Sequence, residues 1–302
     1  IQYADFSFWQ RNWLQGDVLQ KQVDFWVEKL QGAPAILELP TDRPRPVVQT
    51  YVGHTSSFDF PNELSQKIKS FSRQHDVTLN MLLLTAYQIL LSRYSGQDDI
   101  CVGTPVANRN HSELEVLIGF FVNTIVMRTK IDSKSGFEDI LKQVRQYALE
   151  AYAHQDLPFE KVVEVLQPER NMGHTPLFQV MFALQKQHNL EIDLPEISIK
   201  PFAGETGISK FDLSLFIEDG EDNFTGRIEY NTDLFNESTI AQLQKHYVKL
   251  IEGMLQHPEL AIAKIPLLTR DERQVILSDW NNKQVAYNHQ TIQQIFEQMV
   301  NN

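Results

Sequence analysis

A histidine and a carboxylate lie two residues apart in this sequence, at His154 and Asp156, with Gln155 between them. Such a pair has the residue types that general acid–base catalysis uses. The local pattern favours a structural role instead, because His154 lies where a predicted helix ends. We expect Gln155 and Asp156 to hydrogen-bond the backbone at the turn into Pro158.

A carboxamide interrupts an otherwise apolar run, where Asn123 follows Phe120, Phe121 and Val122. An amide can hydrogen-bond a substrate or a neighbouring strand end without bringing a charge, and both interpretations are open at this point. Arg128 follows on the same predicted strand. A buried guanidinium is costly without a partner, so we expect Arg128 to pair with a carboxylate inside the fold.

Other common catalytic arrangements are missing from the sequence. The single cysteine, Cys101, lies in the apolar run Ile100–Val102 and is expected to be a small buried hydrophobe. One cysteine excludes an internal disulfide and a cysteine-rich zinc site. The nine histidines are scattered, and no glycine-rich phosphate loop or G-x-S-x-G turn occurs. We therefore predict no metal ligands and no bound nucleotide.

Composition narrows the class of partner. The 302 residues carry a formal net charge of −12, which argues against nucleic acid, whose phosphates are bound mainly through Lys and Arg. Apolar runs such as Met81–Leu84 are far shorter than the ~20 residues of a membrane helix. The first ten residues lack the basic start and apolar stretch of a signal peptide. We predict a cytoplasmic protein that contacts neither nucleic acid nor membrane.

The hydrophobic pattern predicts helices and strands in mixed order, and thus an α+β fold with helices covering a largely β layer. Helices are expected over Leu19–Leu30, Asn62–His75 with Asn62 as cap, Met81–Leu91 capped by Thr78, Gly136–Ala153, Pro158–Leu166, Ser238–Leu255 and Thr291–Val300. Strands are expected over Thr50–Phe60, Asp99–Val106, Phe120–Ile131, Leu177–Gln185, Ile192–Phe202, Ile208–Glu218 and Phe224–Tyr230, with a hairpin at 220–223. Beyond Leu260 the periodicity is lost, which indicates a domain boundary.

Four stretches stand in a fixed order between Tyr3 and Leu177: YADFSFW at 3–9, IGFFVNT at 118–124 with Arg128 after it, HQDLPFE at 154–160 and RNMGHTPL at 170–177. They resemble the motifs Y-x-D-[FY]-A-x-W, [IV]-G-x-F-V-N-T…R, [HN]-Q-D-x-P-F-E and R-x-x-S-R-x-P-L of nonribosomal peptide synthetase condensation domains. Gly173 and His174 depart from the Ser and Arg of the last motif. Each motif alone is weak evidence, whereas four in order are specific.

Two segments extend the resemblance. Residues 92–100 and 102–109 are similar to the family's region before the second motif. Past the boundary, Leu268, Thr269, Glu272, Trp280 and Asn281 look like the linker into an adenylation domain. Thr291–Glu297 resembles that domain's first helix. We therefore predict the C-terminal part of a condensation domain over 1–262, and the linker and first adenylation helix over 263–302.

The resemblance implies a chloramphenicol acetyltransferase-like half-domain, with a mixed sheet covered by helices. The family's reactive H-H-x-x-x-D-G motif is absent, so this chain is expected to supply one wall of a substrate tunnel and no catalytic residue. Asn123, Phe121 and Gly119 are the predicted channel residues. The predicted structural motif residues are Tyr3, Asp5, Trp9, Arg128, His154, Gln155, Asp156, Pro158 and Pro176.

The implied reaction is amide formation between acyl or peptidyl and aminoacyl thioesters. Both would be carried on 4'-phosphopantetheine arms of partner carrier domains, with no cofactor on this chain. Expected partners are the N-terminal half of the condensation domain, the upstream and downstream peptidyl carrier domains and the adjoining adenylation domain. We expect the fragment to be inactive alone and to expose an apolar face that the missing half covers.

Several alternatives stay open. The related epimerisation and heterocyclisation domains share the fold, and a non-catalytic scaffold that docks carrier domains is a different class of function. The motifs at 117–124 and 154–160 look more like the subtype that accepts an L-configured donor. In the family a latch crosses between the halves, and Glu205–Leu215 is the candidate for it here.

Overall fold

The computed structural model describes residues 1–169, 171–186, 206–282 and 290–301, which fall into two compact units, 1–267 and 268–302. The second unit holds short helices: α9 (Arg270–Gln274), the π-helical turn η2 (Val275–Asp279) and α10 (Ile292–Val300). Thr269 and Thr291 begin α9 and α10, each with a capping box in which the hydroxyl accepts from the third backbone N–H of the helix.

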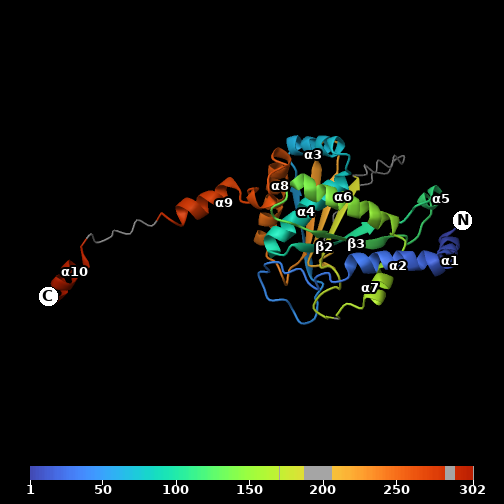
Figure 1. The fold of residues 1–302 in the computed structure, drawn as a ribbon, viewed down its shortest axis with the longest axis horizontal. Helices are drawn as coiled ribbons and strands as arrows, with labels where there is room; N and C mark the ends of the chain where they lie inside the picture. The colour runs from blue at the N-terminus through green and yellow to red at the C-terminus, as the bar shows by residue number, and fades with distance from the viewer. Residues whose placement is uncertain (170, 187–205, 283–289, 302) are drawn as a thin grey trace, which may run out of the picture. The chain divides into compact units, whose positions relative to one another are not determined.

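The first unit is built on a six-stranded mixed sheet with strand order β1-β6-β5-β4-β2-β3 (Figure 1). The strands are β1 (Gly53–Asp59), β2 (Asp99–Val106), β3 (Asn123–Lys130), β4 (Val180–Lys186), β5 (Leu213–Asp219) and β6 (Phe224–Asn231). β4 pairs in parallel with β2 and β5, and the other pairs are antiparallel. The predicted hairpin joins β5 to β6, where Gly220 N–H donates to Asn223 O at 3.1 Å.

Four helices pack together as a layer on this sheet: α3 (Asn62–Gln74), α4 (Leu79–Ser95), α6 (Phe137–Ala153) and α8 (Glu237–Gln256). α4 lies at its centre, and every side chain from Met81 to Leu91 is buried, as its apolar sequence predicts. Thr78 caps α4 by accepting from Met81 N–H at 3.2 Å, and Gly96 ends it with a left-handed φ of 73°.

The remaining helices of this unit are α1 (Tyr3–Trp13), α2 (Gly16–Leu30), the single turn α5 (Ser112–Glu115), α7 (Phe159–Leu166) and the 3-10 turn η1 (Ile262–Lys264). Among them, α7 contacts both α2 and β3. Near the C-terminal boundary, Ile262 and Ile265 are still buried, and Arg93 donates to both of their carbonyl oxygens. None of the described helices is long and apolar enough to cross a membrane.

Several predicted boundaries are wrong. Pro61, and not Asn62, occupies the N-cap of α3. β3 begins at Asn123 instead of Phe120, because its partner strand β2 ends at Val106, opposite Asn123; the Phe120 carbonyl oxygen accepts from the Tyr3 hydroxyl. β4 begins only at Val180, after a turn in which Phe178 N–H donates to Pro176 O.

Most of the candidate latch, Glu205–Leu215, packs on the sheet of this chain. Glu205, like the predicted strand Ile192–Phe202, lies outside the described residues. Ser209 is fully buried and its N–H donates to Tyr51 O, while Leu213 already pairs with Val180 in the sheet. The stretch from Ser209 onward is therefore fixed to its own sheet and does not reach away from it.

Cys101 is buried on β2, and burial raises the pKa of its thiol to about 12. Because the thiolate is the reactive species, iodoacetamide at pH 8 is expected to alkylate the native protein about 1,000-fold more slowly than the urea-unfolded chain, whose thiol has an ordinary pKa. Mass spectrometry of timed samples measures both rates. Native and unfolded rates of equal size would contradict the buried position.

Candidate functional site

The first two motifs meet at the N-terminal helix. The Tyr3 hydroxyl donates to Phe120 O at 2.9 Å, and the Tyr3 ring lies edge-on to Phe121, with centroids 5.1 Å apart. Phe6 packs on the same Phe121 ring at 4.8 Å. A Cβ at Gly119 would lie 2.4 Å from the Tyr3 ring, so glycine is required for this approach. The predicted channel residues Gly119 and Phe121 thus face α1 of their own chain.

Asn123 joins the second motif to the third. Its Nδ2 donates to Gln155 O at 2.7 Å and to Leu157 O at 2.8 Å. Its Oδ1 accepts from Thr124 N–H at 2.8 Å and from Phe159 N–H at 3.1 Å. Both amide protons and both oxygen lone pairs are used. The carboxamide therefore clamps the turn before α7 to the start of β3, which corresponds to the structural alternative. A role for Asn123 in lining the channel stays a prediction.

His154 has a structural environment. It ends α6, and its Nδ1 contacts Glu150 O at 2.8 Å. Its ring is stacked on Phe25, 4.0 Å between centroids and 6° between planes. Its carbonyl oxygen accepts from Trp26 Nε1 at 2.9 Å, which ties α6 to α2. Within the protein, one ring nitrogen of His154 is thus hydrogen-bonded and one face of its imidazole is covered by Phe25.

The side chains of Gln155 and Asp156 both form hydrogen bonds with Asn110, a partner that the sequence did not indicate. Gln155 Nε2 donates to Asn110 Oδ1 at 2.8 Å, and Asn110 Nδ2 donates to Asp156 Oδ1 at 3.1 Å. The predicted bonds to the backbone at the turn into Pro158 are thus replaced by one side chain of the 107–111 loop; Pro158 itself occupies the N-cap of α7. Burial raises the pKa of the Asp156 carboxyl above its usual range.

Arg128 pairs with a carboxylate, as expected. Its Nε and Nη2 donate to the two oxygens of Asp99 at 2.8 and 2.6 Å. The remaining protons go to three carbonyl oxygens at the end of α2, those of Lys29, Gln31 and Gly32, at 2.9, 3.0 and 3.1 Å. All five guanidinium donors are used. The hydrogen bonds to Asp99 raise the pKa of Arg128 further.

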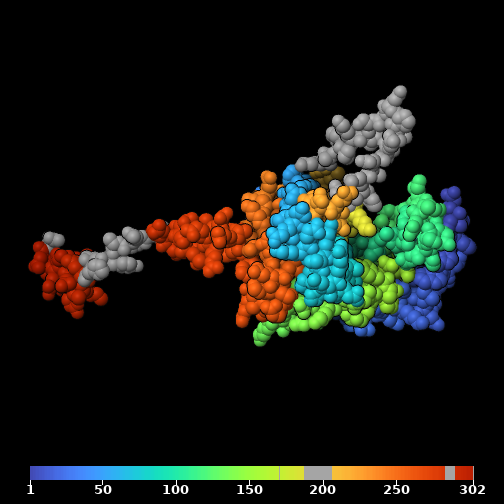
Figure 2. Space-filling model, turned by 90° about the horizontal axis from the view of Figure 1, so that it is seen from above, coloured from blue at the N-terminus to red at the C-terminus, as the bar shows by residue number. Residues whose placement is uncertain are grey.

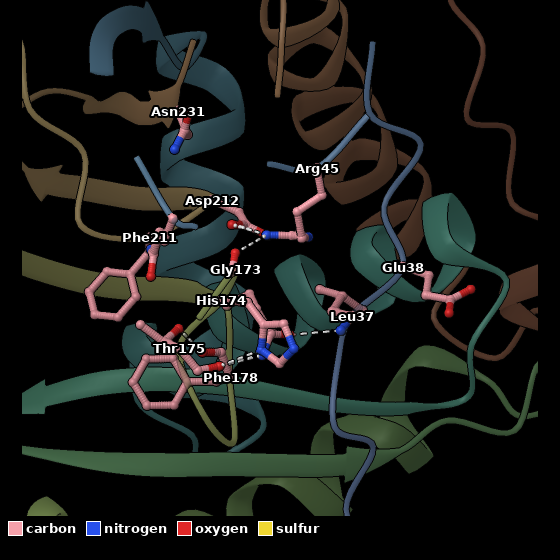
Figure 3. Close-up of polar contacts among 12 residues, drawn as sticks. Leu37, Glu38, Arg45, Gly173, His174, Thr175, Phe178, Phe211, Asp212 and Asn231 are labelled. Carbon is pink, nitrogen blue, oxygen red and sulfur yellow. Dashed lines mark hydrogen bonds and ion pairs between the residues drawn. The ribbon is translucent and has the colours of Figure 1, made fainter. Parts of the chain in front are cut away.

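The fourth motif folds into a turn over a second ion pair (Figure 3). Arg45 donates through Nη1 to Asp212 Oδ1 at 2.9 Å, through Nη2 to Oδ2, and more weakly to Gly173 O. The Asp212 side chain is 4% exposed. In the turn itself, the His174 Nδ1 contacts Thr175 O at 3.1 Å. Arg170 lies outside the described residues.

Exposed apolar side chains gather on α1 and the adjoining 116–122 segment. Ile118 is 98% exposed and Phe120 is 80% exposed. Other large apolar side chains exposed on these two segments are Tyr3, Phe8, Trp9, Trp13, Val116 and Val122. We call this set the α1–116 surface. Elsewhere in the described ranges, no three His, Cys, Asp or Glu side chains converge as metal ligands would.

The profile of the Condensation domain family matches residues 1–277. The chain belongs to this family. It is 48% identical over 302 residues to a linear gramicidin synthase of Brevibacillus parabrevis, covering 99% of this chain and 4% of that protein. Gramicidin S synthase 2 of Brevibacillus brevis is 36% identical over 303 residues, again covering 99% of this chain and 7% of the relative.

Solved structures confirm the predicted α+β, chloramphenicol acetyltransferase-like half-domain with its mixed, helix-covered sheet. The X-domain from teicoplanin biosynthesis superposes with a TM-score of 0.80 at 25% identity, over 89% of this chain and 62% of that one. A four-domain nonribosomal peptide synthetase bound to AMP and glycine gives 0.78 at 25% identity, over 84% and 20%. This condensation-domain chain thus spans about three fifths of the X-domain and a small part of each synthetase.

Proposed function

We propose that this chain is part of a condensation domain that joins carrier-bound acyl or peptidyl and aminoacyl thioesters by a peptide bond. The observation that carries the proposal is the family match over 1–277, together with the contacts that join its first three motifs at the start of β3. The gramicidin synthase relatives and the solved nonribosomal peptide synthetase support it. The amino acids of the motifs at 117–124 and 154–160 favour the subtype that accepts an L-configured donor.

In this reaction an amine attacks a thioester carbonyl and a thiol leaves, so the enzyme must align two substrates and assist one proton transfer. The described residues suit alignment. The side chains of three motif residues, Asn123, Arg128 and His154, all form hydrogen bonds within this chain. These bonds would hold the wall of the proposed substrate tunnel in place. The H-H-x-x-x-D-G segment of the N-terminal half would supply the base. Within the 118–124 motif, Ile118, Phe120 and Val122 present their side chains outward, and we propose that they contact the other half or the substrate channel.

The partners follow from the same proposal. Upstream and downstream carrier domains would bring the thioesters on 4'-phosphopantetheine arms, and the segment 263–302 would lead into an adenylation domain. α10 supports this, because Ile292, Phe296 and Met299 expose large apolar side chains at helical spacing. An amphipathic helix of this kind needs a partner surface to cover it.

A non-catalytic docking scaffold is the second candidate function. Its specific support is the solved complex of the X-domain with OxyB, whose X-domain superposes on this chain with a TM-score of 0.80 at 26% identity. Epimerisation and heterocyclisation domains remain related alternatives within the catalytic class.

A condensation assay with two loaded carrier domains tests the proposal. It compares this chain alone, the chain with the N-terminal half added, and the same pair carrying His154→Ala, with dipeptidyl thioester followed by mass spectrometry. We expect product only when both halves are present, with at least half of the rate kept in the His154 variant. Binding of the carriers without product, from the joined halves as well, would favour the scaffold. Product from the chain alone would place the base in it.

A further inference from the structure

A pocket of about 290 Å³ lies between α1 on one side and the 107–111 loop with the start of α5 on the other. Figure 2 shows the two elements next to each other, α1 in blue and the α5 region in green. Its walls hold both indoles of α1, a histidine, a carboxylate and several amides; the lining residues are Phe6, Trp9, Gln10, Trp13, Asn108, Asn110, His111, Leu114 and Asp156. Sites for drug-sized ligands start near ~300 Å³, so this pocket suits a single large side chain.

Aromatic rings make up one side of the pocket. Trp9 and Trp13 are stacked, with centroids 5.2 Å apart and planes 10° apart. The His111 ring lies edge-on to Trp9 at 5.7 Å and 90°. Stacked indoles present a π face of the type that attracts cations most strongly among aromatic side chains.

Carboxylates make the pocket acidic. Asp156 receives one hydrogen bond, from Asn110, and forms no ion pair among the described residues. An adjoining hollow of about 390 Å³ shares Trp9 and His111 with the pocket and adds Asp5 and Glu113. In the part of the chain that the structure describes, no lysine or arginine lines either hollow, although Ile1 lines the second. The guanidinium of Arg109 lies close by, where it donates to the Leu114 carbonyl oxygen and lies over the Phe121 ring at 4.1 Å, and it forms no ion pair with Asp156. A carboxylate partly removed from water and without a cation is costly, and a bound cation offsets that cost.

We propose that this pocket, formed by Trp9, Trp13, His111 and Asp156, binds an arginine side chain presented by the N-terminal half of the condensation domain. The planar guanidinium can stack on an indole while its fork donates to a carboxylate, which an ammonium cannot do in the same way. The α1–116 surface borders the pocket through Trp9, so a partner that covers this apolar surface is placed to insert the side chain. The identity of the partner rests on the proposed function.

The first test uses the chain alone and a defined probe, N-acetyl-L-arginine methylamide, followed by the NMR shifts of the tryptophan indole N–H groups. The citrulline analogue is the matched control, since it has nearly the same shape and no charge. We expect saturable shifts of Trp9 and Trp13 with the arginine probe and at least tenfold weaker binding of the citrulline probe. Equal binding of the two probes, or no binding of either, overturns the proposal.

Variants locate the site and identify the partner. Asp156→Asn keeps an acceptor for Asn110 and is expected to weaken the arginine probe about tenfold, while Asp139→Asn on α6 leaves it unchanged. Trp13→Leu is a second variant, should the first unfold. The purified N-terminal half is expected to bind Asp156→Asn about tenfold more weakly than the wild type in calorimetry. Equal binding overturns the proposal and leaves the proposed function intact; condensation activity of the joined halves is measured separately.

Discussion

Replacing Asn123 with alanine is expected to lower the free energy of unfolding by about 3 kcal/mol. The substitution removes four hydrogen bonds and leaves two carbonyl oxygens and two backbone N–H groups without their partner. Each such bond contributes about 1 kcal/mol net, and an orphaned buried group costs about 1–3 kcal/mol, partly offset here by water. Urea unfolding followed by circular dichroism measures the change.

Two further variants separate the clamp from simple loss of packing. Asn123→Asp has the same shape and keeps both acceptor bonds, but its carboxylate would face the carbonyl oxygens of Gln155 and Leu157. Its destabilisation relative to wild type should therefore be smaller at pH 4, where the protonated acid can donate, than at pH 8. Asn110→Ala, at an exposed carboxamide, should cost less than about 1 kcal/mol. A similarly small loss in Asn123→Ala would show that the four bonds do not hold the turn.

The second large effect is expected at Arg128. Removing one partner of a buried ion pair costs about 3–5 kcal/mol, because the other charge stays buried without compensation. The Arg128 side chain is 9% exposed and that of Asp99 is 17% exposed, so Arg128→Ala should destabilise the domain by that amount. Arg128→Lys keeps the charge but cannot reproduce five donors in a fixed fork, and about 2 kcal/mol should still be lost.

An exposed pair provides the matched control. Arg145 and Asp76 form an ion pair with side chains 39% and 92% exposed, and exposed pairs contribute about 0–1 kcal/mol. Arg145→Ala is therefore expected to change the urea midpoint little, whereas Arg128→Ala shifts it strongly. Equal shifts in the two variants would mean that the Arg128 network adds nothing beyond a surface ion pair.

Both predictions concern residues of the family motifs, and both treat those residues as parts of the scaffold. Asn123 fixes the turn before α7, and Arg128 fixes the end of α2 against β3. These two motif residues therefore stand where segments far apart in the sequence are held together by side-chain hydrogen bonds. Side chains of the same segments that bond nothing in this chain's core, such as Ile118 and Phe120, are exposed.

The sequence by itself determined most of the regular elements. The apolar stretch of α4, the Thr78 cap and the β5–β6 hairpin follow from local rules, because helix periodicity, capping and turn propensity act within a few residues. The buried partner of Arg128 was also predictable in kind, since a guanidinium within a β-rich core requires a carboxylate.

Only the tertiary structure decided which partner each polar group takes. Arg45 and Asp212 are 167 residues apart, and no local pattern connects them. Asn110 satisfies Gln155 and Asp156 because the 107–111 loop runs beside their turn, and the Tyr3 hydroxyl bonds Phe120 O from a helix 117 residues away. The physical reason is that hydrogen bonds need defined distances and angles. Those are fixed only when segments far apart in the chain have packed together.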